Sequence, residues 1–169
     1  MTAQRKETVI TIRTAVESDH GKIIGVMPDW WDGRDLRVGL PRLFLVHFTE
    51  TSFIAERQGE LIAFLVGFLS PARPNEGYIH FAGVHPAYRG QGVMRRLYEK
   101  FFASCLERDR TIVRCCTSPV NRTSIAFHRK MGFSLEKGDC EVDGISYTSD
   151  YNRPSDHKVL FVKLLRPDR

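Results

Sequence analysis

The sequence predicts a mixed α/β (α+β) fold in a single domain over residues 1–169, with its core at about 9–165. Three observations indicate this class: the length, the composition and the order of the hydrophobic patterns. The chain has 169 residues, of which 42% are hydrophobic and 27% charged, so it can bury one core of ordinary size. Strand-like and helix-like patterns alternate along it, which predicts a mixed central sheet of about seven strands flanked by about four helices.

Seven strands and four helices are expected, in the order β-α-α-β-β-β-α-β-α-β-β. The predicted strands are residues 8–15, 52–56, 61–69, 78–85, 111–117, 133–136 and 159–165. The predicted helices are residues 19–27, a segment between Leu36 and His47, 91–108 and 122–131.

The N-terminal elements follow from their boundary residues. Ser18 or Asp19 is the expected N-cap of the first helix. Pro41 is expected to start or kink the second helix, because proline lacks the N–H that a helix interior needs. A tight turn at Gln58-Gly59-Glu60 joins the next two strands into a hairpin.

The helix over 91–108 carries the strongest periodic signal. Its apolar positions follow i, i+3, i+4, i+7 and i+11 at Met94, Leu97, Tyr98, Phe101 and Cys105. Because this helix connects two strands, it predicts at least one parallel crossover.

The C-terminal helix over 122–131 is bounded by Asn121, a good N-cap, and Gly132, a good residue for the helix end. Residues 138–157, which follow it, are polar, acidic and rich in turns.

Composition excludes several classes of protein. The longest apolar run, residues 61–69, is too short for a bilayer helix, and residues 1–7 precede no apolar stretch of a secretory signal. We therefore expect a cytoplasmic protein that neither spans nor binds a membrane. In that compartment the four cysteines are expected to be thiols, and neither they nor the six histidines show metal-ligand spacing, so no metal is expected.

The strongest chemical signal is the glycine-rich stretch from Val84 to Leu97. Gly90 and Gly92 remove side chains where the first amides of a long helix point outward, and such amides suit a pyrophosphate. Arg89 and two further arginines add positive charge nearby. The stretch lacks both the Walker pattern and the third glycine of a dinucleotide fingerprint. The alternative is a tight strand-to-helix turn that needs glycine only for its backbone conformation.

Two blocks resemble the GNAT superfamily of acyl-CoA N-acyltransferases. Arg89-Gly-Gln-Gly-Val-Met94 resembles the family loop Arg/Gln-x-x-Gly-x-Gly/Ala. Asn121 to Phe133 resembles Asn-x-x-Ala-x-x-x-Tyr-x-x-x-Gly-Phe. One helix and one strand separate the blocks, as the family requires. Three positions depart from the family: Met94 replaces Gly or Ala, Ser124 replaces Ala, and His128 replaces a Tyr thought to protonate the departing thiolate.

The resemblance implies an acetyl-CoA-dependent N-acetyltransferase that acts on a primary amine. The residues expected to bind the coenzyme are Gly83, Val84, Arg89, Gly90, Gln91, Gly92, Val93, Met94, Asn121 and Ser124. The catalytic candidates are His128, as a hydrogen-bond donor to sulfur, and Tyr78 and His80, which share one face of their strand. For the base, Glu76, Asp150 and a water relay stay open beside His80.

The acceptor candidates are Trp30, Trp31, Asp143 and Asp150. In this family an early helical hairpin lines the acceptor site, which suggests one of the two tryptophans. The acidic segment 138–157 lies in a chain of net charge +5 and predicts a small cationic amine, unless it is only a solvated hairpin.

Two other functions compete with this interpretation. One is a catalytically silent module that binds or senses acyl-CoA. The other is a nucleic-acid-binding domain, which is disfavoured because the arginines gather around the glycine loop instead of forming a basic stripe with aromatics. We expect acetyl-CoA and an amine as partners, with no nucleic acid, and we allow for a homodimer.

Overall fold

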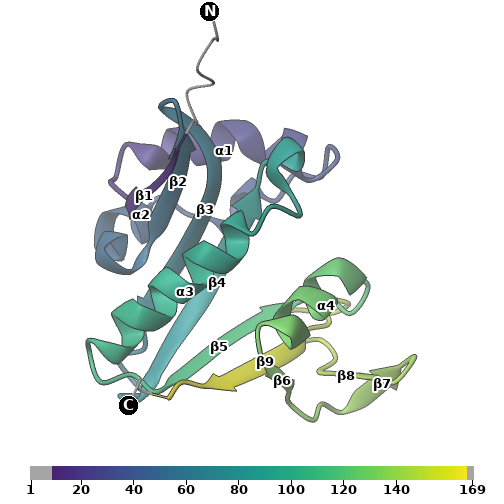
Figure 1. Ribbon diagram of the computed structural model, residues 1–169. Coiled ribbons are helices and arrows are strands. Elements are labelled where there is room, and N and C mark those ends of the chain that lie inside the picture. The colour runs from purple at the N-terminus through teal and green to yellow at the C-terminus, as the bar shows by residue number, and fades with distance from the viewer. Residues whose placement is uncertain (1–8, 167–169) are drawn as a thin grey trace, which may run out of the picture. The chain divides into compact units, whose positions relative to one another are not determined.

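The computed structural model describes residues 9–166 (Figure 1). Within these residues the chain forms four α-helices, one mixed sheet of seven strands and one separate two-stranded hairpin. The predicted fold class is confirmed. No helix in the described range has the length and apolar character needed to cross a bilayer.

The elements follow the predicted order, and two short strands within residues 138–157 are additional. The helices are α1 (Asp19–Trp30), α2 (Leu43–His47), α3 (Val93–Leu106) and α4 (Arg122–Lys130). The strands are β1 (Ile10–Thr14), β2 (Phe53–Arg57), β3 (Glu60–Leu69), β4 (Glu76–Val84), β5 (Ile112–Thr117), β6 (Ser134–Leu135), β7 (Cys140–Val142), β8 (Ile145–Tyr147) and β9 (Val159–Leu164).

The strand order of the large sheet is β1-β2-β3-β4-β5-β9-β6. β4 and β5 pair in parallel and are connected by α3, so the predicted crossover is confirmed. The predicted hairpin is also confirmed: β2 and β3 are antiparallel, and Gln58 and Gly59 turn with φ of 54° and 80°. Positive φ at both central residues is the geometry that matches the twist of a two-residue hairpin.

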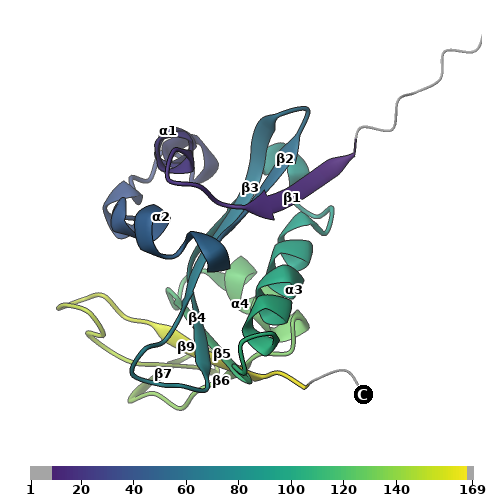
Figure 2. The ribbon, with the colours of Figure 1, turned by 90° about the vertical axis from the view of Figure 1, so that its left-hand side faces the viewer.

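The chain divides into two compact units. The first contains residues 9–67 and 81–101 of the described chain, and the second contains residues 68–80 and 102–166. In the first unit, α1 and α2 lie on one side of the strands β1 to β3, as Figure 2 shows. Their apolar faces form a core with side chains such as Ile23, Met27 and Phe64, each fully buried.

The second unit is built on β5, β9 and β6, with α4 packed against β9. Cys115 to Phe161 and Cys116 to Leu160 are register pairs between β5 and β9. Cys115 is buried and Cys116 half-buried, because neighbouring side chains of a strand point to opposite faces of the sheet. The four cysteines are free.

α1 begins at Asp19, as predicted, with Ser18 at the N-cap position. Ser18 makes no side-chain cap hydrogen bond, however, and Asp19 is the first helical residue. The Asp19 carboxylate is buried, which opposes ionisation, but bonds from the Arg13 guanidinium and the Val16 N–H outweigh this and lower its pKa. The carboxylate therefore fastens the helix to β1 instead of capping it.

The end of α1 also differs. The helix extends beyond the predicted residue 27 through Pro28 to Trp30, which places Trp30 in a helix and not in a loop. A proline in the last turn removes one backbone hydrogen bond, which the surrounding core outweighs.

Two further segments contain more secondary-structure elements than the pattern predicts. Between Leu36 and His47, a short 3₁₀ turn over Arg37–Gly39 precedes α2, and Pro41 separates the two. The helix thus begins after Pro41, as expected, and the apolar residues before it do not continue it. In the acidic segment, β7 and β8 pair as a hairpin around Asp143 and Gly144, both with positive φ.

Candidate functional site

The glycine loop lies between a 3₁₀ turn, Pro86–Tyr88, and the first residue of α3. Gly90 and Gly92 have φ of 73° and 77°, a region that favours glycine. A Cβ built on either residue would meet no atom within 4 Å. The glycines are therefore needed for the path of the backbone, and the space beside them is open.

The backbone amides of residues 90–95 have no acceptor among residues 9–166. The next amide, that of Arg96, donates to the Gly92 oxygen at 3.1 Å. Unpaired amides at a helix start carry partial positive charge and bind anions. The loop thus has the chemistry of a phosphate cradle, with open space where a phosphate would lie.

Most side chains of the loop bond to backbone oxygens or pack within the protein. Gln91 donates to the Ala87 oxygen at 2.9 Å. Arg89 donates from Nε to the Val84 oxygen at 3.4 Å and from Nη2 to the Trp30 oxygen. Val93 is buried and Met94 half-buried. Met94 thus finds room in the position where the family usually has Gly or Ala.

Gly83 on β4 is small for a reason that the sequence did not reveal. A Cβ on Gly83 would lie 2.3 Å from a ring carbon of Trp31 and 3.0 Å from the Phe64 ring. The indole of Trp31 also meets Phe81 edge-on at 5.5 Å. Packing against Trp31 therefore requires glycine here, whether or not a ligand approaches the backbone.

The two tryptophans differ in exposure. Trp30 is 3% exposed and stacks on Phe64 at 5.9 Å, so it belongs to the core of the first unit. Trp31 is half-buried and lies beside the end of β4. Of the two, Trp31 is the one that can also meet a ligand.

In the second unit, α4 carries the predicted polar stripe. Asn121 Oδ1 accepts the Ser124 amide at 3.1 Å, which confirms Asn121 as the N-cap. His128 is 5% exposed and stacks on Phe161 at 4.5 Å, with the edge of Phe133 at 5.3 Å. The alternative that His128 is a surface residue is therefore wrong.

The hydrogen bonds of His128 determine its tautomer. Nδ1 lies 2.7 Å from the backbone oxygen of Ser124, which requires the proton on Nδ1. In the neutral ring, Nε2 then carries no proton and can accept a hydrogen bond but not donate one. Burial lowers the pKa of His128, partly offset by the bond to Ser124, so the neutral form prevails near pH 7.

Tyr78 lies on β4, and its hydroxyl is 3.5 Å from Cys116 Sγ on β5. The phenol ring stacks on Phe68 at 5.5 Å. Burial, together with Cys116, raises the pKa of Tyr78 far above its ordinary value. This hydroxyl stays protonated, so it can donate a hydrogen bond and cannot serve as a base. His80, two residues further along β4, is half-buried.

The predicted acceptor carboxylates are exposed. The Asp143 side chain is 73% exposed at the β7–β8 turn and pairs with Arg122. The Asp150 side chain is 61% exposed, and its carboxylate accepts the Ser155 amide at 2.7 Å. Glu76, another proposed base, pairs with Arg114 at 3.0 Å.

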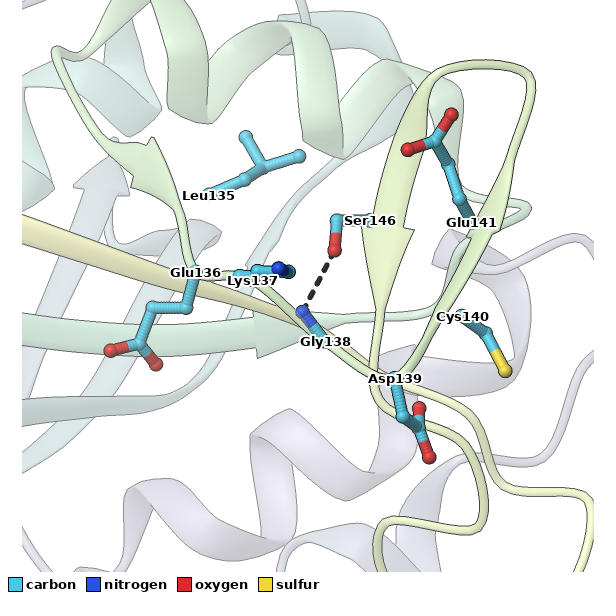
Figure 3. A pocket seen from close by; sticks show the side chains of 8 residues that line it. All are labelled: Leu135, Glu136, Lys137, Gly138, Asp139, Cys140, Glu141 and Ser146. Atoms are coloured by element: carbon cyan, nitrogen blue, oxygen red, sulfur yellow. Dashed lines mark hydrogen bonds between the residues drawn. The ribbon is translucent and has the colours of Figure 1, made fainter.

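A pocket of about 500 Å³ lies beside the β7–β8 hairpin (Figure 3). It is lined by Leu135, Glu136, Lys137, Gly138, Asp139, Cys140, Glu141 and Ser146. The Gly138 amide donates to Ser146 Oγ at 2.8 Å across it. None of the predicted site residues lines this pocket.

The predicted residues thus fall into two groups. The first unit contains the loop, Gly83, Val84 and the two tryptophans, and the second contains Tyr78, His80, Asn121, Ser124, His128, Asp143 and Asp150. Sequence reasoning missed His85, whose Nδ1 accepts the Ala87 amide at 3.1 Å and caps the turn before the loop. Its place directly before Pro86 was the available signal. Within residues 9–166, no cluster of three His, Cys, Asp or Glu could hold a metal ion.

Comparisons with known proteins support the family resemblance and the fold. A sequence model described as the Acetyltransferase (GNAT) family matches residues 27–133. The match includes the glycine loop and the whole of α4, and it extends over more than half of the chain. This protein belongs to the GNAT acetyltransferase family.

Six curated relatives match, each named L-2,4-diaminobutyric acid acetyltransferase. The relative from Nocardia farcinica is 30% identical over 94 residues, which is 53% of this chain and 49% of the relative. The chain covers between 29% and 59% of the length of these relatives.

Solved structures show the same fold. Ard1 from Thermoplasma volcanium has a TM-score of 0.73 at 19% identity, with 94% of this chain and 99% of that chain covered. Diaminobutyrate acetyltransferase EctA from Paenibacillus lautus, in complex with L-2,4-diaminobutyric acid and coenzyme A, has a TM-score of 0.68 at 18% identity. The coverage there is 96% of this chain and 99% of that one.

Proposed function

We propose that this protein is an acetyl-CoA-dependent N-acetyltransferase that transfers the acetyl group to a primary amine. The observation that carries the proposal is the loop from Gly90 to Met94, where glycines with positive φ, unpaired amides and open space occur together. Family membership supports the same reaction.

The amides of residues 90–94 would receive the pyrophosphate, and the backbone of Gly83 and Val84 would lie along the pantetheine arm. Asn121 and Ser124 would take further contacts near the sulfur. The coenzyme would supply the activated acetyl group, and the protein would hold the thioester in line with the amine.

The amine must lose a proton before or during attack. Tyr78 is unsuitable as the base because its phenol stays neutral. Glu76 is less suitable because Arg114 holds it. We therefore assign proton removal to His80 or to a water relay, with Asp150 as a remaining alternative.

For His128 we propose a supporting role, without transfer of a proton to the thiolate. The expected donation to sulfur needs a proton on Nε2, which the bond to Ser124 and the lowered pKa disfavour. A thiolate is a fair leaving group without such help.

A catalytically silent acyl-CoA-binding module is the second candidate, and the burial of His128 in place of the family tyrosine favours it. The decisive experiment measures binding and turnover side by side. Calorimetry with coenzyme A and with pantetheine tests the loop, and we expect much tighter binding of coenzyme A. Thiol release from acetyl-CoA with a panel of amines tests transfer. Binding without release for any amine would favour the silent module, and equal affinity for both ligands would exclude the phosphate loop.

For the acceptor we propose a small cationic amine, such as a polyamine, an aminoglycoside-like amine or a lysine side chain. L-2,4-diaminobutyric acid joins the panel because the curated relatives are named for it. Asp143 and Asp150 are the proposed electrostatic contacts. Each is changed to Asn and kcat/KM is measured at two salt concentrations. Because both carboxylates are exposed and Asp143 is already paired with Arg122, we expect less than about a tenfold loss for either change. No loss and no salt effect would indicate a neutral or anionic acceptor.

We further propose a cytoplasmic location, because a reducing compartment keeps cysteines as thiols. The homodimer stays a prediction, which light scattering would test.

A further inference from the structure

Arg89 is exposed, yet its guanidinium is engaged with backbone carbonyls. Nη2 donates to the Trp30 oxygen and Nε to the Val84 oxygen at 3.4 Å. An arginine that serves as a phosphate ligand would direct these donors into the open space beside Gly90 and Gly92. Here they are directed to the protein itself.

The carbonyl that accepts from Arg89 Nη2 belongs to Trp30, the last residue of α1. The final carbonyls of a helix have no partner inside it. The Met27 and Pro28 oxygens receive the Trp31 and Gly33 amides at 3.2 Å and 2.8 Å. The Trp30 oxygen receives Arg89 instead, and a cation at a helix C-terminus is favourable.

A second contact joins the same two segments. The His85 ring meets the Trp30 ring edge-on at 5.7 Å and the Tyr88 ring at 5.5 Å. His85 Nδ1 also accepts the Ala87 amide, so the ring is fixed at the start of the loop. The chain is therefore attached to Trp30 at His85, just before the 3₁₀ turn, and again at Arg89, where the loop begins.

We propose that Arg89 is a positioning residue that ties the end of α1, with Trp30 and Trp31, to the pyrophosphate loop. This inference rests on the proposed function, in which Gly90 to Met94 bind the coenzyme, and on the sequence-based expectation that one of the two tryptophans lines the acceptor site. Arg89 acts through the Trp30 carbonyl and not as a phosphate ligand. Occupancy of the loop and the placement of the tryptophans are then linked.

The two tryptophans are the only ones in the sequence, so intrinsic fluorescence reports on this place alone. The variants are Arg89→Lys and Arg89→Gln, studied without coenzyme. Lysine keeps the charge but lacks the planar fork that reaches two carbonyls. We expect both variants to shift the emission to the red and to raise the quenching constant for acrylamide about twofold, as the rings lose packing.

Arg95→Gln is the matched control. Arg95 also lies at the start of α3, but its Nε bonds to Glu99 at 2.8 Å. This variant removes the same charge beside the loop, and the emission should stay at the wild-type value.

Affinity for coenzyme A separates positioning from direct charge. If Arg89 is a positioning residue, Arg89→Lys and Arg89→Gln weaken coenzyme A binding by similar factors. The KM of the amine then rises together with that of acetyl-CoA. If Arg89 were a phosphate ligand, Lys would keep most of the affinity while Gln would lose about tenfold or more. That second pattern, or unchanged emission in both variants, overturns the proposal.

A second measurement uses the wild type alone. Inorganic pyrophosphate should change the tryptophan emission saturably, since the loop and Trp30 are tied. Calorimetric binding of pyrophosphate with no change in emission contradicts the link. The proposed function can fail while this inference holds. If the wild type binds no coenzyme A but the Arg89 variants still shift the emission, the coenzyme site is rejected and the link between Arg89 and Trp30 is retained.

Discussion

The N-termini of α3 and α4 differ in whether their first backbone amides have a hydrogen-bond acceptor within the chain. At α4, Asn121 accepts the Ser124 amide at 3.1 Å. At α3, Gly90 and Gly92 have no side chain that could supply an acceptor, and the amides of residues 90–95 have no acceptor within the described chain. A helix start that supplies its own acceptor is structural, whereas one that leaves its amides unpaired can receive an anion.

The largest test of this comparison is Gly92→Asp. Asp adds a negative charge where the pyrophosphate is expected, so we predict a loss of coenzyme A affinity beyond about 100-fold. Calorimetry measures it. Gly92→Asn is the matched control, because Asn has the same size and tolerates positive φ similarly. It should lose much less. Equal losses for both variants would mean that the loop is only a turn.

The next test concerns His128 at the other end of α4. General-acid help is typically worth about 10²–10⁴ in rate, and a buried neutral His128 should contribute at or below the low end. We predict that His128→Phe lowers kcat by at most about 100-fold and that His128→Tyr keeps most activity. A loss of 10³ or more in His128→Phe, with normal coenzyme binding, would show that the ring has a catalytic task.

Much of this comparison was accessible from the sequence. The two glycines before an amphipathic helix and the Asn121 cap are local signals, and both helices form where the patterns predict. Local signals also located the hairpin at Gln58-Gly59, since a turn depends on the residues within it.

What the sequence could not predict depends on contacts between distant residues. The packing of Trp31 against Gly83 joins positions that are far apart in the chain, and so does the bond from Arg89 to the Trp30 carbonyl. The same holds for the tautomer of His128, which depends on a 2.7 Å contact in the folded helix. Periodicity identified the face of α4 but not what that face would touch.

A smaller effect is expected for the cap of α4. Asn121→Ala removes the acceptor of the Ser124 amide, and we predict a loss of about 1 kcal/mol in the free energy of unfolding. Urea unfolding measures it. Asn121→Asp keeps an oxygen acceptor and should retain most of the stability. If Asn121→Ala were as stable as wild type, the bond from the Ser124 amide to Asn121 would not stabilise the start of α4. The contrast with α3 would then weaken.

The smallest expected effect is the pH dependence of stability that comes from His128. Burial lowers its pKa in the folded state below the ordinary value of about 6.5, so the unfolded chain binds more protons in the window just below that value. Stability is therefore complete above about pH 6.5 and falls as the pH drops, with a slope of at most about 1.4 kcal/mol per pH unit for one proton. His128→Phe keeps an aromatic ring on Phe161 and removes the titration, so the comparison isolates one group. We expect the unfolding free energy of wild type, minus that of the variant, to decrease between about pH 8 and pH 5. A flat difference would mean that the imidazole titrates in the folded protein as it does in the unfolded chain, and α4 would then present a titrating group as open to a ligand as the amides of α3.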